Sequence, residues 1–322
     1  MWTCYHSKLH QTLKDRHLLP KKSKILIAVS GGQDSLCLAK LCLDLQLKWQ
    51  WQISIVHYDH GWTLDEGLAD HVQKIAHDWG IEFYLEKAQQ KIPESEAQAR
   101  KYRYEGLINV ATKHQYNYLI TGHTLSDRAE TFLYNLIRGA GMEGLSALNW
   151  TRKLTDNITL VRPLLNFTRS DTLSFCHQLQ LPIWEDKYNE DKKFARNRLR
   201  LDLIPHIKKE FNPKIEQHLA QTAEILRADV EFLTQEAEKL FNLAYRDDSL
   251  TRSSLKDKPL SLRRRVVKMF LAQKLKTMPN FEQIEAVVRL IEAPNLDRTS
   301  SLHQGYFAQV IQDSIVIQKS DN

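Results

Sequence analysis

The sequence predicts an α/β protein with a doubly wound parallel sheet, followed by a second, mainly helical domain that ends in a small β-hairpin. Short β-rich runs alternate with helix-like stretches from residue 24 to residue 138, which is typical of a parallel sheet covered by helices on both faces. From residue 213 onward this alternation gives way to one long helical pattern. These observations predict two domains, residues 1–212 and 213–322.

The first elements follow from the spacing of apolar residues. Residues 24–30 (KILIAVS) predict a strand, and residues 34–47 predict a mostly apolar, buried helix. Residues 52–58 predict the second strand. The helix after it has one apolar face, because its apolar residues recur at helical spacing: Leu68, Val72, Ile75, Ala76 and Trp79.

The remaining elements of the first domain repeat the alternation. Residues 81–85 and 118–121 predict strands, and residues 96–114 and 126–138 predict helices. Gly139 is predicted to cap the last of these helices. The apolar residues of that helix are predicted to face inward: Ala129, Phe132, Leu133, Leu136 and Ile137.

The second domain begins near residue 212, because Asn212 can cap a helix and Pro213 suits the first helical position. Leucines then recur every seven residues: Leu219, Leu226, Leu233 and Leu240. A coiled coil or a helix packed along a neighbouring domain would explain this heptad pattern, and we favour the second. Residues 305–317 predict a hairpin with its turn at 312–314.

The composition of the 322-residue chain excludes several classes of protein. With 42% hydrophobic and 26% charged residues, the chain is not collagen-like, of low complexity or largely disordered. The 4 cysteines form no C-x-x-C pair, which argues against a disulfide framework and favours a reducing compartment. No apolar stretch is long enough to span a bilayer, and the N-terminal residues do not resemble a signal peptide. The sequence therefore predicts a soluble, cytoplasmic protein without a membrane partner.

The net charge of +6 favours a polyanionic partner such as RNA or DNA. Basic residues concentrate in the stretches 192–209 and 263–276, although a solvated helix face would explain either stretch alone. The arginines at 263–265 are predicted to point outward, with no local acid to neutralise them. We therefore predict nucleic-acid contacts for these arginines: Arg196, Arg198, Arg200, Arg263, Arg264 and Arg265.

The strongest chemical signal is the sequence SGGQDS, residues 30–35, between the first strand and the first helix. Paired glycines allow a phosphate to approach the backbone closely, and the helix start offers free N–H groups and a positive dipole. Asp34 is a candidate ligand for a Mg²⁺ ion bound to the phosphates. The motif is neither the P-loop nor the dinucleotide fingerprint. The alternative is a glycine turn that only starts a helix.

Two further polar clusters follow the second and fourth predicted strands. Because ligands of open α/β sheets bind beyond the carboxyl ends of the strands, we expect these clusters to meet the loop in one crevice. Asp127 and Glu130 lie three residues apart, hence on one helical face, although Asp127 could simply cap its helix. A zinc site is an alternative for some of these residues, but no closed Cys/His spacing supports it. The residues of that alternative are His57, Asp59, His60 and His123.

These motifs carry a resemblance to a known family. The loop resembles the signature of the PP-loop ATP pyrophosphatases, which have an adenine nucleotide α-hydrolase-like fold. The set HYDHG, EAQARKYRYEGL, TGHTLSDRAETFLYNLIRGAGMEGL, VRPLL and ARNRLR resembles the tRNA(Ile)-lysidine synthases of that superfamily. The resemblance extends in order over residues 24–210, and the second domain shares it only faintly. Two departures are the Trp62-Thr63 pair, where the family usually has Leu-Arg, and Thr124 with Ser126, where a His and an acid are usual.

The resemblance implies a reaction. Free L-lysine is ligated to C2 of the wobble cytidine in the CAU anticodon of tRNA(Ile), with ATP and Mg²⁺ and through an adenylated cytidine. It implies that Arg100 and Arg103 face the phosphate charge and that Asp127 and Glu130 hold the lysine, with the choice of base left open. Catalytic roles fall to Asp34, Arg100, Asp127 and Glu130. Nucleotide binding falls to Ser30, Gly31, Gly32, Gln33, Asp34, Ser35, His57, Asp59, His60, Gly122, His123 and Arg103.

Other functions remain alternatives at this point. A tRNA cytidine thiolase of the same ATP-activating class would need paired cysteines, which the chain lacks. A small-molecule amidating synthetase would not explain the basic second half. A nucleotide-sensing protein without turnover is the alternative from a different class.

Overall fold

The computed structural model describes residues 2–62, 65–88, 96–184, 192–302 and 305–319. The chain divides into two compact units, which we call unit 1 (Met1–Leu226) and unit 2 (Arg227–Asn322). Each unit has a hydrophobic core of its own. None of the helices in the described ranges is long and apolar enough to cross a membrane.

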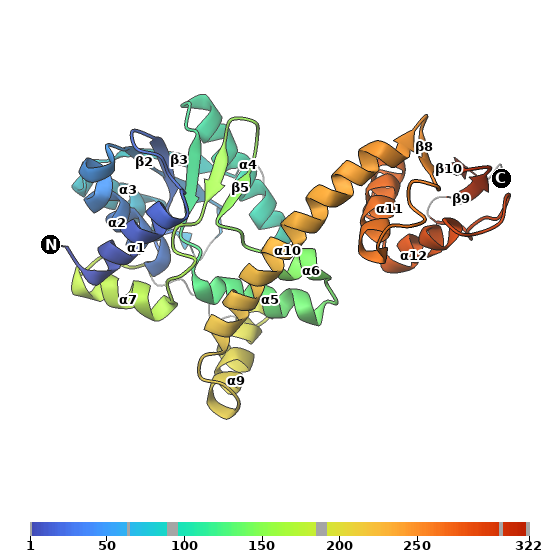
Figure 1. The fold of residues 1–322 in the computed structure, drawn as a ribbon. Helices are drawn as coiled ribbons and strands as arrows, with labels where there is room; N and C mark the ends of the chain where they lie inside the picture. Colours follow the sequence, from blue (N-terminus) through green and yellow to red (C-terminus); the bar gives the residue numbers. More distant parts are fainter. Residues whose placement is uncertain (1, 63–64, 89–95, 185–191, 303–304, 320–322) are drawn as a thin grey trace. The chain divides into compact units, whose positions relative to one another are not determined.

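Unit 1 is built on a six-stranded sheet of order β3-β2-β1-β4-β6-β5. Figure 1 labels β2, β3 and β5 of this sheet. The strands are parallel except β5, which pairs antiparallel with β6 at one edge. The predicted doubly wound sheet is therefore confirmed, and the antiparallel edge adds to it. The strands are β1 (Lys24–Ala28), β2 (Gln52–Asp59), β3 (Glu82–Lys87), β4 (Tyr118–Thr121), β5 (Thr151–Lys153) and β6 (Thr159–Val161).

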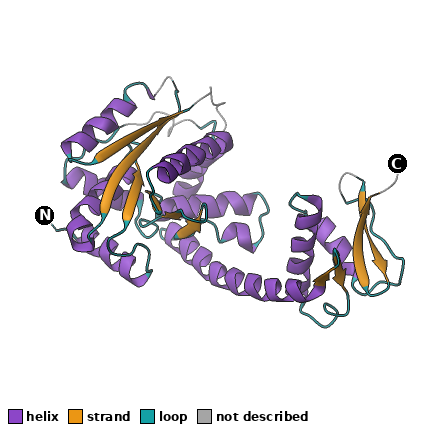
Figure 2. Cartoon of the chain, turned by 90° about the horizontal axis from the view of Figure 1, so that it is seen from above, coloured by secondary structure: helices purple, strands orange, loops and turns teal. Residues whose placement is uncertain are grey.

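Helices cover both faces of this sheet (Figure 2). The central strands are apolar throughout because both faces are buried. Ile25 and Ile27 of β1 pack into one core with α1, α2, α3 and α7, whereas Leu26 packs with α4 on the other face. The helices of unit 1 are α1 (Cys4–Asp15), α2 (Gln33–Trp49), α3 (Leu68–Asp78), α4 (Glu96–Lys113), α5 (Leu125–Ile137), α6 (Met142–Leu145), α7 (Arg169–Gln178), α8 (Ala195–Arg198), the π-helical turn η3 (Leu199–Leu203) and α9 (Ile204–Glu210).

The strand order places the ligand-binding edge of the sheet. β2 and β4 lie on opposite sides of β1, so the chain reverses its direction of winding there. The loops after β1 and β4 meet at this switch point, where open α/β sheets bind ligands. Gly122 at the end of β4 lies so close to the loop after β1 that an added Cβ would come within 2.7 Å of the Asp34 carbonyl oxygen.

The sequence predicts the last turn of α5 incorrectly. Leu136 and Ile137 were expected to face inward, but they are 49% and 66% exposed. The buried part of α5 ends at Leu133, because the last helical turn extends past the core that covers the first two. Gly139 follows the C-cap residue Arg138 and has a φ of +74°, a conformation that favours glycine.

The long helix α10 (Ile215–Ala244) begins in unit 1 and ends in unit 2. Asn212, the predicted cap, lies three residues before this start, and its side-chain oxygen accepts a hydrogen bond from the Lys214 backbone N–H of the preceding turn at 2.9 Å. The apolar stripe that contains the four heptad leucines also contains Ala223, Ala237 and Ala244. This stripe is buried at Ala223 and again from Ala237 onward, and it is half-buried between them.

Unit 2 packs the end of α10 against two helices and a four-stranded antiparallel sheet of order β7-β8-β10-β9. The predicted C-terminal hairpin is confirmed, with its turn at Gln312 and Asp313. The short strands before it were not predicted. The elements are β7 (Tyr245–Arg246), β8 (Ser249–Thr251), α11 (Leu260–Leu275), α12 (Phe281–Leu290), β9 (Tyr306–Ile311) and β10 (Ser314–Lys319).

Candidate active site

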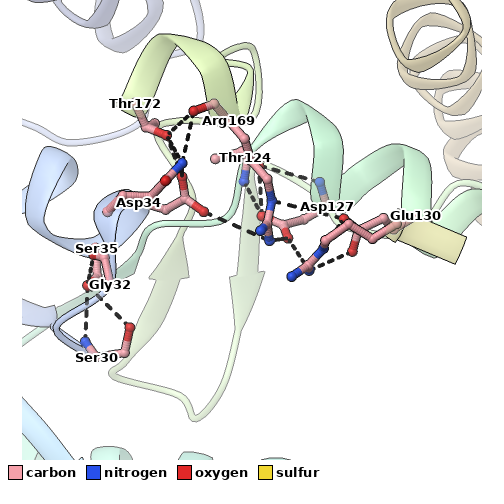
Figure 3. A network of polar contacts seen from close by, with 11 residues as sticks. Ser30, Gly32, Asp34, Ser35, Thr124, Asp127, Glu130, Arg169 and Thr172 are labelled. Atoms are coloured by element: carbon pink, nitrogen blue, oxygen red, sulfur yellow. Dashed lines mark hydrogen bonds and ion pairs between the residues drawn. The ribbon is translucent and has the colours of Figure 1, made fainter. Parts of the chain in front are cut away.

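The loop after β1 holds its shape through its own hydrogen bonds (Figure 3). The Ser35 hydroxyl accepts from the Ser30 backbone N–H at 3.1 Å and donates to the Gly32 carbonyl at 2.9 Å. Gly31 has a φ of +84°, and a Cβ there would lie 2.6 Å from a Leu68 methyl group. The loop is therefore preformed at the N-terminus of α2, where free backbone N–H groups attract an anion.

Asp34, in the first turn of α2, is held by groups from α7. Thr172 donates its hydroxyl to Asp34 Oδ1 at 2.5 Å, and Arg169 Nη2 lies 3.9 Å from Asp34 Oδ2. Burial raises the pKa of Asp34, and the nearby Asp127 charge raises it further, whereas Arg169 and Thr172 oppose the shift. The carboxylate thus faces Arg169 and Thr172 of α7 in a charged, largely buried environment (Figure 3).

Asp127 and Glu130 lie together on the first turns of α5, as predicted. The two oxygens of Asp127 have separate partners: Oδ2 accepts from the Thr124 backbone N–H and hydroxyl at 2.7 and 2.8 Å, and Oδ1 faces Arg169 Nη2 at 3.0 Å. Asp127 therefore caps its helix and also carries charge into the site. Thr124 is the N-cap residue of α5.

Glu130 is 3% exposed and forms a bidentate pair with Arg200 of η3. Arg200 Nε and Nη2 donate to its two carboxylate oxygens at 2.7 and 2.9 Å. Arg169 connects the whole group, because its guanidinium lies within 4.0 Å of Asp34, Asp127 and Glu130 (Figure 3). The loop and the two predicted carboxylates thus belong to one network of ion pairs.

The protonation of this network follows from its charges. Burial alone would raise the pKa of Asp127, but Arg169, His123 and the Thr124 N–H together hold it below its usual value. Burial also lowers the pKa of His123, and the cations Arg162, Arg103 and Arg100 lower it further, against the opposing effect of Asp127. At neutral pH the site therefore holds an ionised aspartate beside a neutral histidine.

The other predicted nucleotide-binding residues lie around the loop at different depths. His57 is 3% exposed, and its Nδ1 lies 2.8 Å from the Val29 carbonyl oxygen, so it supports the loop from behind. Asp59 accepts from the Gly61 backbone N–H at 2.8 Å. The half-buried His60 ring stacks on Trp62 with 4.6 Å between the ring centroids, and burial lowers its pKa to about 4. Thr63, the neighbour of Trp62, lies outside the described residues.

The arginines predicted to contact nucleic acid in unit 1 lie in three different places. Arg200 pairs with Glu130, an acid 70 residues away in sequence, and its predicted contact with nucleic acid stays a prediction. Arg198 donates to the Lys192 and Lys193 carbonyls at 2.9 and 3.1 Å. Arg196 lies over the Tyr134 ring, with 5.7 Å from its guanidinium carbon to the ring centroid.

The expectation that no acid neutralises the arginines at 263–265 is wrong for Arg263 and Arg264. Arg263 Nη1 donates to Glu292 at 2.7 Å, and Arg264 forms a two-point pair with Glu285 at 2.6 and 3.1 Å. Glu285 belongs to α12 and Glu292 lies just beyond it. Because tertiary packing against α12 supplies these acids, the local sequence around α11 gives no sign of them.

The zinc alternative gains no support. Within the described part of the chain, no three His, Cys, Asp or Glu side chains come close enough together to hold a metal ion. Cys37, Cys42 and Cys176 are buried free thiols, and burial raises the pKa of each.

Comparison with known proteins agrees with this geometry. Residues 1–207 match the model of the PP-loop domain. A tRNA(Ile)-lysidine synthase of Nostoc sp. (strain PCC 7120) is 48% identical, with 100% of this chain and 98% of that protein covered. The tRNA(Ile)-lysidine synthase of Synechocystis sp. (strain PCC 6803) is 47% identical over 94% of this chain and 93% of that protein. The chain belongs to the tRNA(Ile)-lysidine synthase family.

Membership of the tRNA(Ile)-lysidine synthase family makes the chain a PP-loop ligase that uses ATP. Among solved structures, a U34-tRNA thiolase of Methanococcus maripaludis with a [4Fe-4S] cluster is similar, with a TM-score of 0.59, 20% identity and coverage of 69% of this chain and 77% of that one. At that identity the likeness concerns the fold alone. The burial of Cys37, Cys42 and Cys176 further weakens the thiolase alternative, and it leaves Cys4 as the exposed cysteine of the chain.

Sequence reasoning missed two members of the site, Arg169 and Thr172. Both lie at the start of α7, which begins with a capping box of Thr168 and Asp171. The spacing T-x-x-D signals a helix start, and that signal could have found α7. It could not have shown that α7 packs against α2 and brings Arg169 to three carboxylates.

Proposed function

We propose that this chain ligates free L-lysine to C2 of the wobble cytidine in the CAU anticodon of tRNA(Ile), converting ATP to AMP and pyrophosphate. One observation carries the assignment of residues: Arg169 joins Asp34 beside the phosphate loop to Asp127 and Glu130. A group for activating a substrate with ATP and a group for holding a cationic nucleophile therefore share one site.

In the first step, the loop at residues 30–35 and the N-terminus of α2 hold the phosphates of ATP. Oxygen O2 of the cytidine attacks the α-phosphorus, the bond to the β-phosphate oxygen breaks, and pyrophosphate leaves. Asp34 offers the carboxylate oxygen that Mg²⁺ prefers and belongs to the loop itself, so it fits a Mg²⁺ ion shared with the phosphates. Bound there, Mg²⁺ would neutralise the charge that develops on the pyrophosphate.

In the second step, the lysine ε-amine attacks C2 and the C2–O2 bond breaks, so that AMP leaves with O2. Glu130, Arg169 and Arg200 line a pocket of about 830 Å³ within unit 1, which has room for a free amino acid. The lowered pKa of Asp127 suits a permanent negative partner for an ammonium group. We assign to Glu130 the removal of the proton that the attacking amine loses.

A single assay tests this proposal. The purified protein is expected to release AMP and pyrophosphate only when tRNA(Ile), L-lysine, ATP and Mg²⁺ are all present, and mass spectrometry of the digested tRNA is expected to find lysidine. Release of ADP and phosphate, or turnover that does not depend on lysine, would contradict it. A tRNA transcript with a GAU anticodon is the matched control and is expected to remain unmodified.

A further inference from the structure

A second pocket of unit 1, of about 500 Å³, is separate from the pocket that Glu130 lines, and of the residues expected to be catalytic it contains Arg100. We call it the arginine pocket. It lies on another side of the helical turn that carries the carboxylates: Thr131 of α5 lines it, whereas the preceding Glu130 lines the larger pocket. A ligand in the arginine pocket would therefore sit one residue along α5 from the proposed reaction site.

Positive charge converges on this pocket from separate segments of the chain. Its arginines come from α4, the end of α5, β5, the residue after β6, and α8: Arg100, Arg138, Arg152, Arg162 and Arg196. Among the described residues that line it, Glu143 is the single acid. Like charges that gather in one concave site repel one another, so the pocket favours an anion with several negative oxygens.

Arg162 is the buried arginine of this pocket, so its charge is the least favourable of the set. It is 2% exposed, and its Nη1 donates to the Asn149 carbonyl at 2.7 Å, while its buried Nε has no hydrogen-bond acceptor among the described residues. Burial lowers the pKa of Arg162 and Tyr104 opposes this shift, while the charges of Arg100 and Arg152 lower the pKa further. A buried guanidinium among other cations is unfavourable unless a bound anion compensates it.

Two tyrosine rings contact guanidinium groups of this pocket. The guanidinium carbons of Arg138 and Arg196 lie 5.3 and 5.7 Å from the centroid of the Tyr134 ring, and Tyr134 also lines the pocket. The guanidinium of Arg100 lies 5.7 Å from the ring of Tyr104. Cations that alternate with aromatic faces suit single-stranded nucleic acid, whose phosphates bind the cations and whose bases stack on the rings.

We propose that the arginine pocket binds the backbone phosphates of the anticodon-loop nucleotides that flank the target cytidine. The proposal rests on the proposed function, because it concerns the RNA substrate of the same site. The loop at residues 30–35 already accounts for the phosphates of ATP, which leaves the phosphates of the RNA for this pocket. Contacts of this kind position a strand without reading its sequence.

The test compares Arg138→Ala, Arg152→Ala and the double variant with Lys153→Ala. Arg138 and Arg152 are exposed enough for the fold to tolerate their truncation. Lys153 is the matched control: it is the next residue of the same short strand, it pairs with Asp156 at 2.9 Å, and it does not line the pocket. The probe is the anticodon stem-loop of tRNA(Ile), and its Kd is measured by fluorescence anisotropy from 50 to 300 mM salt.

Each arginine variant is expected to raise the Kd for the stem-loop about tenfold, the loss of one charge-assisted contact. In the double variant the slope of log K against log salt concentration is expected to fall by about 1.4, for two single-strand phosphate contacts. The Kd for ATP and the KM for lysine are expected to stay at wild-type values, and Lys153→Ala is expected to bind like the wild type.

An unchanged Kd and salt slope in the double variant would overturn the proposal. An equal loss of stem-loop affinity in Lys153→Ala would also overturn it, because it would indicate a general effect of surface charge. A selective loss of product inhibition by inorganic pyrophosphate in the double variant would assign the pocket to that product instead. If the wild type modifies tRNA(Ile) with ATP and lysine but the arginine variants bind the stem-loop like the wild type, the proposed function stands and this inference is wrong.

Discussion

In unit 2, Arg263 and Arg264 follow one another in sequence, and each binds a carboxylate that packing against α12 supplies. In unit 1, Arg138 and Arg152 come from separate elements and enter one pocket that has a single acid among its described lining residues. Arg263 and Arg264, which are adjacent in sequence, are thus neutralised by carboxylates, whereas arginines that are scattered in sequence are brought together in one pocket. Charge density along a chain therefore says little about charge density in space, because partners and neighbours are set by tertiary packing.

The carboxylates of unit 1 give the largest expected contrast. Asp34→Asn is expected to lower kcat by about 10²–10³, because it removes charge stabilisation next to the transferring phosphate. Glu285→Gln, an equal change of charge in unit 2, is expected to leave kcat unchanged. AMP release under saturating substrates measures both. An Asp34→Asn enzyme with near wild-type kcat would reduce the loop to a structural turn.

The second contrast lies within the site of unit 1. Asp127→Asn and Glu130→Gln are each expected to lower kcat/KM for lysine by about 10- to 100-fold, the value of a hydrogen bond to a charged group. The Kd for ATP is expected to change less than the lysine-dependent step. Isothermal titration with ATP beside lysine-dependent kinetics separates the two effects. An equal loss of ATP affinity would move these carboxylates to the nucleotide side of the site.

The arginine run of unit 2 is expected to contribute little to RNA binding. Changing Arg263, Arg264 and Arg265 together to alanine is expected to raise the Kd for full-length tRNA(Ile) less than about threefold, because Glu292 and Glu285 already neutralise Arg263 and Arg264. Filter binding at several salt concentrations measures the effect. A loss as large as that of the double arginine variant of unit 1 would erase the contrast between the two regions.

The smallest expected effect concerns stability. Glu224 of α10 accepts from the buried Arg128 at 2.5 Å and from Trp150 Nε1 at 3.2 Å, whereas Glu285 pairs with the exposed Arg264. Glu224→Gln is expected to reduce the free energy of unfolding by about 1–3 kcal/mol, and Glu285→Gln by less. Denaturant unfolding at pH 7 compares the two variants.

The pH dependence follows from the sign of the shift. Burial alone would raise the pKa of Glu224, but Arg128 and Arg16 hold it below the ordinary value of 4.5. Its ionised form therefore stabilises the fold above pH 4.5, and this contribution is lost as the pH falls through the folded pKa. The difference between the wild type and Glu224→Gln is expected to shrink below pH 4.5. A difference that is constant from pH 7 to pH 3 would mean that Glu224 acts by packing alone.

Much of the fold of unit 1 could be predicted from the sequence, because its strands and helices have strong periodic patterns. The loop at residues 30–35 and the pair Asp127 and Glu130 were accessible in the same way, since their spacing is local. Partners such as Arg169 and Arg200 were not, because an ion pair between residues 42 or 70 positions apart leaves no local pattern. The exposed Leu136 and Ile137 show the opposite failure, in which a regular pattern continues beyond the core that explains it.

The guanidinium groups of Arg169 and Arg200 have a consequence for the evolution of this site. Asp127 and Glu130 already have internal counter-ions, so the folded chain does not depend on a ligand to offset their charge. Active sites with uncompensated charge usually trade stability for activity, and removing the charge then stabilises the protein. Here, the loss of either acid would leave its arginine charged and without that partner, next to the remaining ion pair. A drift toward an inactive sequence at these positions therefore brings no gain in stability.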